Sequence, residues 1–124
     1  MKPLAILLAD DESEIRQLIE LWMSAAGHSV VATASGREAC EALGGRAFDL
    51  VITDLLMPDG DGVDLIAEVR RAHPVMRILA ISGGGRYTEG SDVLNLAQGL
   101  GAHAVVLKPF TAAQLKAGIE RAFA

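Results

Sequence analysis

Four sites in the sequence place reactive side chains directly after short apolar runs. They are Asp10-Asp11, Asp54, Ser82 and Lys108. If the apolar runs are parallel strands of one sheet, their carboxyl ends meet at one edge, where open α/β sheets bind ligands. We therefore expect three carboxylates, one hydroxyl and one ammonium group to lie together.

Such a set of groups favours phosphoryl chemistry assisted by a cation. Three clustered carboxylates raise each other's pKa unless a cation lies beside them. Their hard oxygen atoms suit Mg²⁺, which prefers one or two carboxylates completed by waters and a phosphate oxygen. The Lys108 ammonium suits a second phosphate oxygen. Asp54 follows the run predicted to be central in the sheet, so it is the predicted nucleophile and would form an acyl phosphate.

Each of these residues also has an ordinary interpretation when it is taken alone. Asp10-Asp11 could begin a helix as an N-cap with first-turn acids, and Asp54 could be a turn residue. Ser82 could be a helix cap or a loop hydroxyl, and Lys108 a solvated cation. Their joint occurrence at four predicted strand ends is what favours a site.

The elements that must position these residues alternate along the chain. Five apolar runs are too short for helices and lack polar alternation, which predicts strands covered on both faces. The predicted strands are Leu4–Ala9, Val30–Ala34, Leu50–Thr53, Ile78–Ile81 and Ala104–Leu107. Apolar residues at three- and four-residue steps predict helices near residues 15–26, 37–43, 63–72, 93–100 and 115–123.

Five strands that are each followed by a helix predict an α/β fold. Right-handed crossovers then give a flavodoxin-like, doubly wound (βα)5 three-layer sandwich with parallel sheet order 2-1-3-4-5. The length of 124 residues is that of one domain. We expect residues 1–124 to form that domain, with no output domain.

Charge and hydropathy exclude several classes of protein. The net charge of −5 opposes binding to nucleic acid, which usually needs a clustered basic surface. No apolar run reaches the roughly 18 residues needed to span a bilayer, and Leu4–Ala9 lacks the features of a signal peptide. A single cysteine, Cys40, fits a reducing compartment. We expect a cytoplasmic protein without a membrane or nucleic-acid partner.

Several motifs together resemble response-regulator receiver domains of two-component signalling. They are an acidic pair in Leu8–Glu12, the pattern D-x-x-M-P-x-x-D-G in Asp54–Gly62, the hydroxyl of Ser82, and K-P-F in Lys108–Phe110. The resemblance covers essentially the whole chain. It implies a bacterial signalling phosphoprotein, not an enzyme acting on other substrates, that takes a phosphoryl group from the phosphohistidine of a histidine kinase or histidine phosphotransfer protein.

The resemblance also implies a role for each site residue. Asp54 accepts the phosphoryl group, while Ser82 and Lys108 bind phosphoryl oxygens. Asp11, Asp54 and the Leu56 carbonyl ligate Mg²⁺, and Asp10 holds a coordinated water.

Two backbone features follow from the same resemblance. The peptide bond before Pro109 is expected to be cis, which costs little before proline. Gly60 and Gly62 are expected to shape the turn after Asp54, where a positive φ or a close backbone approach requires glycine.

One departure from the family pattern concerns the route from the site to the surface. The family usually carries Tyr or Phe three residues before the lysine, and this chain has Val105. A long glycine-rich segment also follows Ser82. We hypothesise that Tyr87 or His103 takes over part of the missing ring's role. The competing interpretation is ordinary packing for Tyr87 and an exposed strand start for His103.

The predicted function is a receiver that changes its preference for a downstream target protein when it is phosphorylated. A phosphorelay carrier, a pseudo-receiver that serves only as a binding platform, and an aspartyl-phosphate hydrolase remain alternatives. The hydrolases typically place the nucleophile after the first strand in a D-x-D pattern, which Asp10-Asp11-Glu12 lacks.

Overall fold

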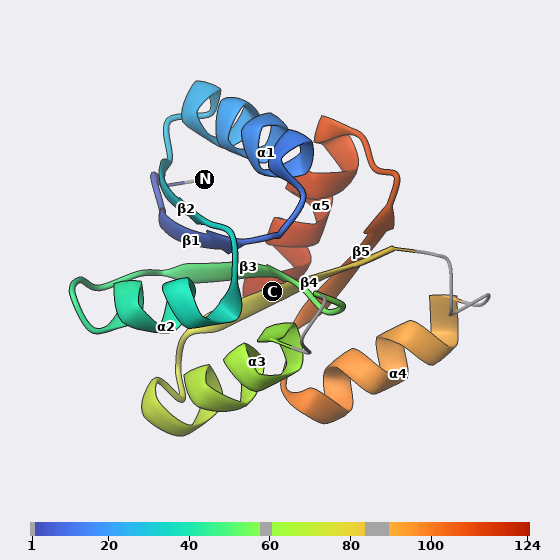
Figure 1. The fold of residues 1–124 in the computed structure, drawn as a ribbon. Helices are drawn as coiled ribbons and strands as arrows, with labels where there is room; N and C mark the ends of the chain where they lie inside the picture. Colours follow the sequence, from blue (N-terminus) through green and yellow to red (C-terminus); the bar gives the residue numbers. More distant parts are fainter. Residues whose placement is uncertain (1, 58–60, 84–89) are drawn as a thin grey trace.

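Residues 2–57, 61–83 and 90–124 are described in a computed structural model of the chain (Figure 1). Strands and helices alternate from the beginning of the chain to its end. The strands are β1 (Ala5–Ala9), β2 (Ser29–Thr33), β3 (Leu50–Asp54), β4 (Arg77–Gly83) and β5 (Ala104–Lys108). The helices are α1 (Ser13–Ala25), α2 (Gly36–Leu43), α3 (Asp61–Ala72), α4 (Gly90–Leu100) and α5 (Ala112–Phe123).

The five strands form one parallel sheet in the order β2-β1-β3-β4-β5, which confirms the predicted fold. β4 is longer than its apolar run, because Arg77 pairs with Leu50 and Ser82 pairs with Leu107. Backbone pairing with the neighbouring strands thus extends β4 to include the polar residues Arg77 and Ser82 at its two ends. Ser82 therefore belongs to the end of a strand rather than to a loop.

Helix boundaries differ from the sequence prediction mainly at the N-termini. α5 begins at Ala112 because Thr111 and Gln114 form a capping box, in which each side chain accepts a hydrogen bond from the other's backbone N–H. The apolar spacing starts one turn later, at Leu115, so periodicity alone placed the start too late. α1 ends before Gly27 as predicted, since Gly27 has a φ of +93°.

Two layers of helices cover the sheet. Figure 1 shows α1 and α5 on one face and α2, α3 and α4 on the other. Successive residues of β1 point to opposite faces, so Ile6 and Leu8 pack in the core under α1 and α5, whereas Leu7 packs in the other core. Burial on both faces fixes the strands and therefore the positions of their carboxyl ends. No helix in the described part of the chain has the length and apolar character to cross a membrane.

The first turn of α3 lies close against the end of β3. A Cβ atom on Gly62 would overlap the backbone carbonyl of Asp54 and would lie 2.8 Å from the carbonyl oxygen of Leu55. This confirms that the chain needs glycine at residue 62 for a close backbone approach. Gly60, which was also expected to shape the turn after Asp54, lies outside the described residues.

Gly62→Ala is therefore expected to lower the free energy of unfolding by roughly 1–3 kcal/mol, because backbone atoms cannot yield to the added methyl group as a flexible side chain can. Urea unfolding measures the change. Gly99→Ala is the matched control, since an added Cβ there meets no atom within 4 Å. The control is expected to be neutral or stabilising by up to about 1 kcal/mol. Equal effects of the two substitutions would contradict the close approach.

Candidate functional site

Three of the predicted site residues meet at the carboxyl edge of the sheet. Asp10 follows β1 and is fully buried, and Asp54 ends β3 and is 3% exposed. Lys108 at the end of β5 places its Nζ 3.2 Å from Asp10 Oδ2 and 3.0 Å from Asp54 Oδ2. The ammonium group therefore lies between two buried carboxylates that come from different strands.

Glu12 is a site residue that the sequence prediction missed. Its Oε1 lies 2.6 Å from Lys108 Nζ, which is the shortest of the ion pairs that this lysine makes with the described residues. Carboxylate oxygens of Asp10, Glu12 and Asp54 all lie within 4.8 Å of one another. Glu12 occupies the N-cap position of α1 but makes no side-chain capping bond. The signal was the acidic run that leads into α1, whose first-turn acids had been considered only in the alternative interpretation of Asp10-Asp11 as a helix N-cap.

Asp11 takes a different place from its neighbours. Its side chain is exposed, and it does not belong to the carboxylate cluster of Asp10, Glu12 and Asp54. Its negative charge nevertheless contributes to a raised pKa at Asp54. The turn explains the separation, because Asp10 Oδ1 accepts a hydrogen bond from the backbone N–H of Glu12 at 2.9 Å and so fixes the path of the chain.

Burial dominates the electrostatics of the site. It raises the pKa of Asp10 and the pKa of Asp54, and the nearby Lys108 ammonium only partly opposes this effect. Burial also disfavours the charged form of Lys108, but its bonds to Glu12 and Asp54 outweigh that cost and hold the pKa of Lys108 above its usual range. Lys108 is thus a permanent cation at neutral pH, and it lies beside two buried carboxylates, Asp10 and Asp54, that are costly to ionise.

Asp10→Asn is expected to stabilise the metal-free protein by about 1 kcal/mol at neutral pH, since it removes a buried charge that the shared Lys108 ammonium only partly compensates. The raised pKa of Asp10 means that the penalty is present at neutral pH and is lost as pH falls through that pKa toward the ordinary value. Chemical denaturation in EDTA should therefore show a difference between variant and wild type that shrinks on acidification. A difference that grows on acidification would contradict the assigned direction.

Ser82 and Leu56 also lie at this edge of the sheet. Ser82 is fully buried at the end of β4. Its Oγ donates a long hydrogen bond of 3.4 Å to the backbone carbonyl of Gly83. The backbone N–H of Leu56 donates to Asp54 Oδ1 at 3.1 Å. Oδ1 of Asp54 is thus held by the backbone, and Oδ2 is held by Lys108.

The β5–α5 connection has the expected cis peptide bond, and Val105 lies at the edge of the core. The peptide bond between Lys108 and Pro109 is cis. Val105 is half-buried and packs against the core on the side of α3 and α4. A small aliphatic side chain thus occupies the place where the family usually has a ring.

His103 does not fit the hypothesis that it replaces that ring. It precedes β5, at the opposite end of the strand from Lys108, and its Nδ1 accepts a hydrogen bond from the backbone N–H of Ile78 at 3.1 Å. It is half-buried rather than an exposed strand start. His103 therefore anchors the beginning of β4. Tyr87, the other residue in the hypothesis, lies outside the described residues.

The chemistry of the cluster fits a divalent cation. Three carboxylates share one ammonium group, and Oδ2 of the fully buried Asp10 relies on that shared ammonium at 3.2 Å. A hard divalent cation would supply the missing positive charge and would take oxygen ligands of this kind. Together with Lys108 and the buried Ser82 hydroxyl, such a cluster can bind and neutralise a phosphoryl group.

A sequence model of the response regulator receiver domain matches residues 6–120, which is most of the chain. The chain belongs to the response-regulator receiver family. This places the protein in two-component signalling, as the motifs predicted. As a receiver domain it is a signalling module.

Solved receiver domains share this fold over nearly their whole length. The receiver domain of NtrX from Brucella abortus is 33% identical, with a TM-score of 0.84 over 94% of this chain and 96% of that one. The chemotaxis response regulator CheY4 of Vibrio cholerae is 26% identical, with a TM-score of 0.86 over 98% of this chain and 99% of that one.

Curated relatives are longer proteins. The probable transcriptional regulator ycf27 of Cyanidium caldarium is 32% identical over 93% of this chain and 44% of its own length. The regulator of RpoS from Escherichia coli K12 is 36% identical over 84% of this chain and 30% of its own length. The receiver chain thus spans less than half the length of these relatives.

Proposed function

We propose that this receiver domain accepts a phosphoryl group on Asp54 and changes its preference for a partner protein as a result. The observation that carries this proposal is the pairing of the buried Asp54 carboxylate with Lys108 at 3.0 Å, beside the further carboxylates of Asp10 and Glu12. A nucleophile, a fixed cation and ligands for a divalent cation are thus available at one edge of the sheet.

Mg²⁺ is the cation proposed for this site, and it would neutralise the charge of the phosphoryl oxygens during transfer. The buried carboxylates of Asp10 and Asp54 would hold it, directly or through water. Asp11 and the Leu56 carbonyl would complete the protein ligands, as the family resemblance implies. Glu12 is close enough to this cluster to add a further carboxylate oxygen.

The remaining steps are carried by the protein's own side chains. An oxygen of Asp54 attacks phosphorus, and the bond between phosphorus and the phosphohistidine nitrogen breaks with its electron pair on that nitrogen, so that a ring already protonated on its other nitrogen leaves as neutral imidazole. Lys108 keeps its charge throughout and binds one phosphoryl oxygen. The Ser82 hydroxyl donates a hydrogen bond to another phosphoryl oxygen. Ser82 is fully buried at the end of β4, so its Oγ would exchange the long bond to the Gly83 carbonyl for this one.

The proposed phosphodonor is a histidine kinase or a histidine phosphotransfer protein, and the proposed outcome is altered binding of a downstream target. The effect of phosphorylation would then pass to that target through the altered surface of the receiver domain. A phosphorelay carrier, the alternative function, would form the same acyl phosphate on Asp54 and then pass the phosphoryl group to the next protein.

Incubation with acetyl phosphate and Mg²⁺, followed by intact mass and phosphate-release measurements, tests the proposal. One phosphoryl adduct per chain supports a receiver. Continuous release of phosphate at a rate typical of an enzyme would instead indicate an aspartyl-phosphate hydrolase. An unchanged mass would indicate a binding platform that is not phosphorylated.

A further inference from the structure

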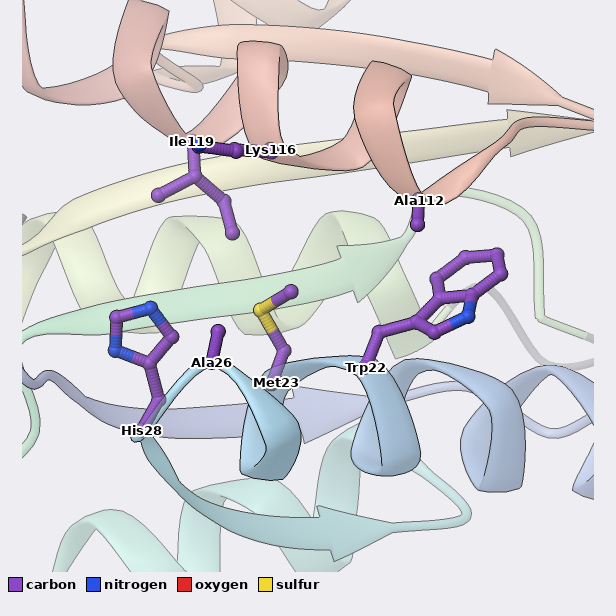
Figure 2. A pocket seen from close by; sticks show the side chains of 7 residues that line it. All are labelled: Trp22, Met23, Ala26, His28, Ala112, Lys116 and Ile119. Atoms are coloured by element: carbon purple, nitrogen blue, oxygen red, sulfur yellow. The ribbon is translucent and has the colours of Figure 1, made fainter.

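A pocket of about 290 Å³ lies between the C-terminal part of α1 and the first turns of α5 (Figure 2). Its apolar wall is formed by Trp22 and Met23 of α1 and by Ile119 of α5. Met23 and Ile119 belong to the buried core on this face, and Trp22 packs against its edge. The pocket is therefore an opening into the core between two helices.

Two small residues explain why this hollow exists. Ala26 is the C-cap of α1, and Ala112 is the first residue of α5. Both line the pocket, and neither side chain is long enough to fill the space between the helices (Figure 2). A larger side chain at either position would close it.

The polar groups that line the pocket all favour an anion. His28 accepts a hydrogen bond from the backbone N–H of Leu4 on Nδ1 at 2.9 Å, so the neutral ring carries its proton on Nε2 as a donor. Lys116 adds an ammonium group from α5. No acidic side chain is among the described residues that line this pocket.

We propose that the pocket binds a small carboxylate with an aromatic or branched aliphatic body. The volume is at the small end of the range for ligand sites, roughly 300–1,000 Å³, and suits a compact molecule rather than a folded partner. The apolar body would lie against Trp22 and Met23, and the carboxylate would lie near Lys116 and His28. This inference concerns binding alone and does not depend on phosphorylation of Asp54.

Trp22 gives the pocket a direct spectroscopic readout, because it is the only tryptophan of the chain. Its ring also meets Phe110 edge to face, with centroids 6.1 Å apart. Phe110 lies two residues after Lys108, so the pocket wall adjoins the loop that leaves the acidic site. A ligand that contacts Trp22 should change its fluorescence on saturation.

The test compares 3-phenylpropionate with the uncharged 3-phenylpropan-1-ol, using Trp22 fluorescence and amide chemical shifts of the full chain. We expect saturable binding of the carboxylate, with the largest shifts near Met23, His28 and Ile119. Lys116→Met should weaken binding of the carboxylate about fivefold and leave binding of the alcohol unchanged, as expected for one partly exposed charge pair. Lys2→Met is the matched control and should change neither.

Ala112→Leu fills the pocket at an exposed position and should weaken binding of both probes by about tenfold or more. An unchanged unfolding temperature would show that this variant is folded. Equal binding of the two probes to the wild type would overturn the proposal. So would shifts that map outside the pocket, or no saturation at millimolar concentrations.

Discussion

Asp54→Asn is expected to abolish the phosphoryl adduct that the wild-type protein forms with acetyl phosphate and Mg²⁺. The amide lacks the negative charge needed to attack phosphorus, so the initial rate should fall on the order of 100-fold or more. Intact mass spectrometry over a time course measures the loss. The variant should fold, because burial raises the pKa of Asp54 and a neutral side chain avoids the cost of that buried charge.

Asp64→Asn is the matched control for that experiment. Asp64 is an exposed residue of α3, and the substitution makes the same change in charge. It should be phosphorylated like the wild type. A persistent adduct on the Asp54→Asn variant would mean that another residue is the acceptor, and the proposed function would then have to be assigned to a different side chain.

Lys108→Met is expected to destabilise the metal-free protein by roughly 3–5 kcal/mol at neutral pH, because two buried carboxylates lose the ammonium group that compensates them. Methionine keeps an unbranched apolar side chain in place of the lysine stem, so the change is mainly one of charge. Urea unfolding in EDTA measures the loss. Added Mg²⁺ should recover part of it, since a divalent cation would replace the missing charge.

The loss should also shrink as pH falls from neutral. Without Lys108 the pKa values of Asp10 and Asp54 lose a nearby positive charge and rise further, so acidification neutralises both carboxylates in the folded state and restores stability. Lys116→Met makes the same substitution at an exposed position and should stay within about 0.5 kcal/mol of the wild type. Equal stability of the two variants would show that Lys108 does not compensate the buried acids.

The Asp54→Asn experiment tests the phosphorylation chemistry of the site, and the Lys108→Met experiment tests how its charges stabilise the fold. Asp54 is proposed to supply the nucleophile, whereas Lys108 holds three carboxylates together through contacts of 2.6–3.2 Å. Glu12 has the shortest of these contacts, and its side chain is 58% exposed, whereas those of Asp10 and Asp54 are buried. Transfer of a phosphoryl group to Asp54 would therefore require Lys108 to exchange a carboxylate contact for a phosphoryl oxygen.

The sequence by itself determined the order of the elements and most of the residues at the carboxyl edge. Short apolar runs such as Leu50–Thr53 can be covered on both faces only in a sheet between helix layers, and parallel pairing then brings Asp10, Asp54, Ser82 and Lys108 to one edge. Period and polarity are local properties of the chain, so they are readable without coordinates.

Only the tertiary structure decided which acidic side chain of the run after β1 meets Lys108. Glu12 rather than Asp11 contacts the ammonium because the turn at Asp10 sets the direction of each acidic side chain, and the Lys108 side chain reaches them from the end of β5. The tertiary structure also decided that His103 accepts a hydrogen bond from the backbone N–H of Ile78, and that a pocket lies between Ala26 and Ala112. Each depends on distances between residues far apart in the chain. Such distances follow from how the helices pack on the sheet, and no local pattern encodes them.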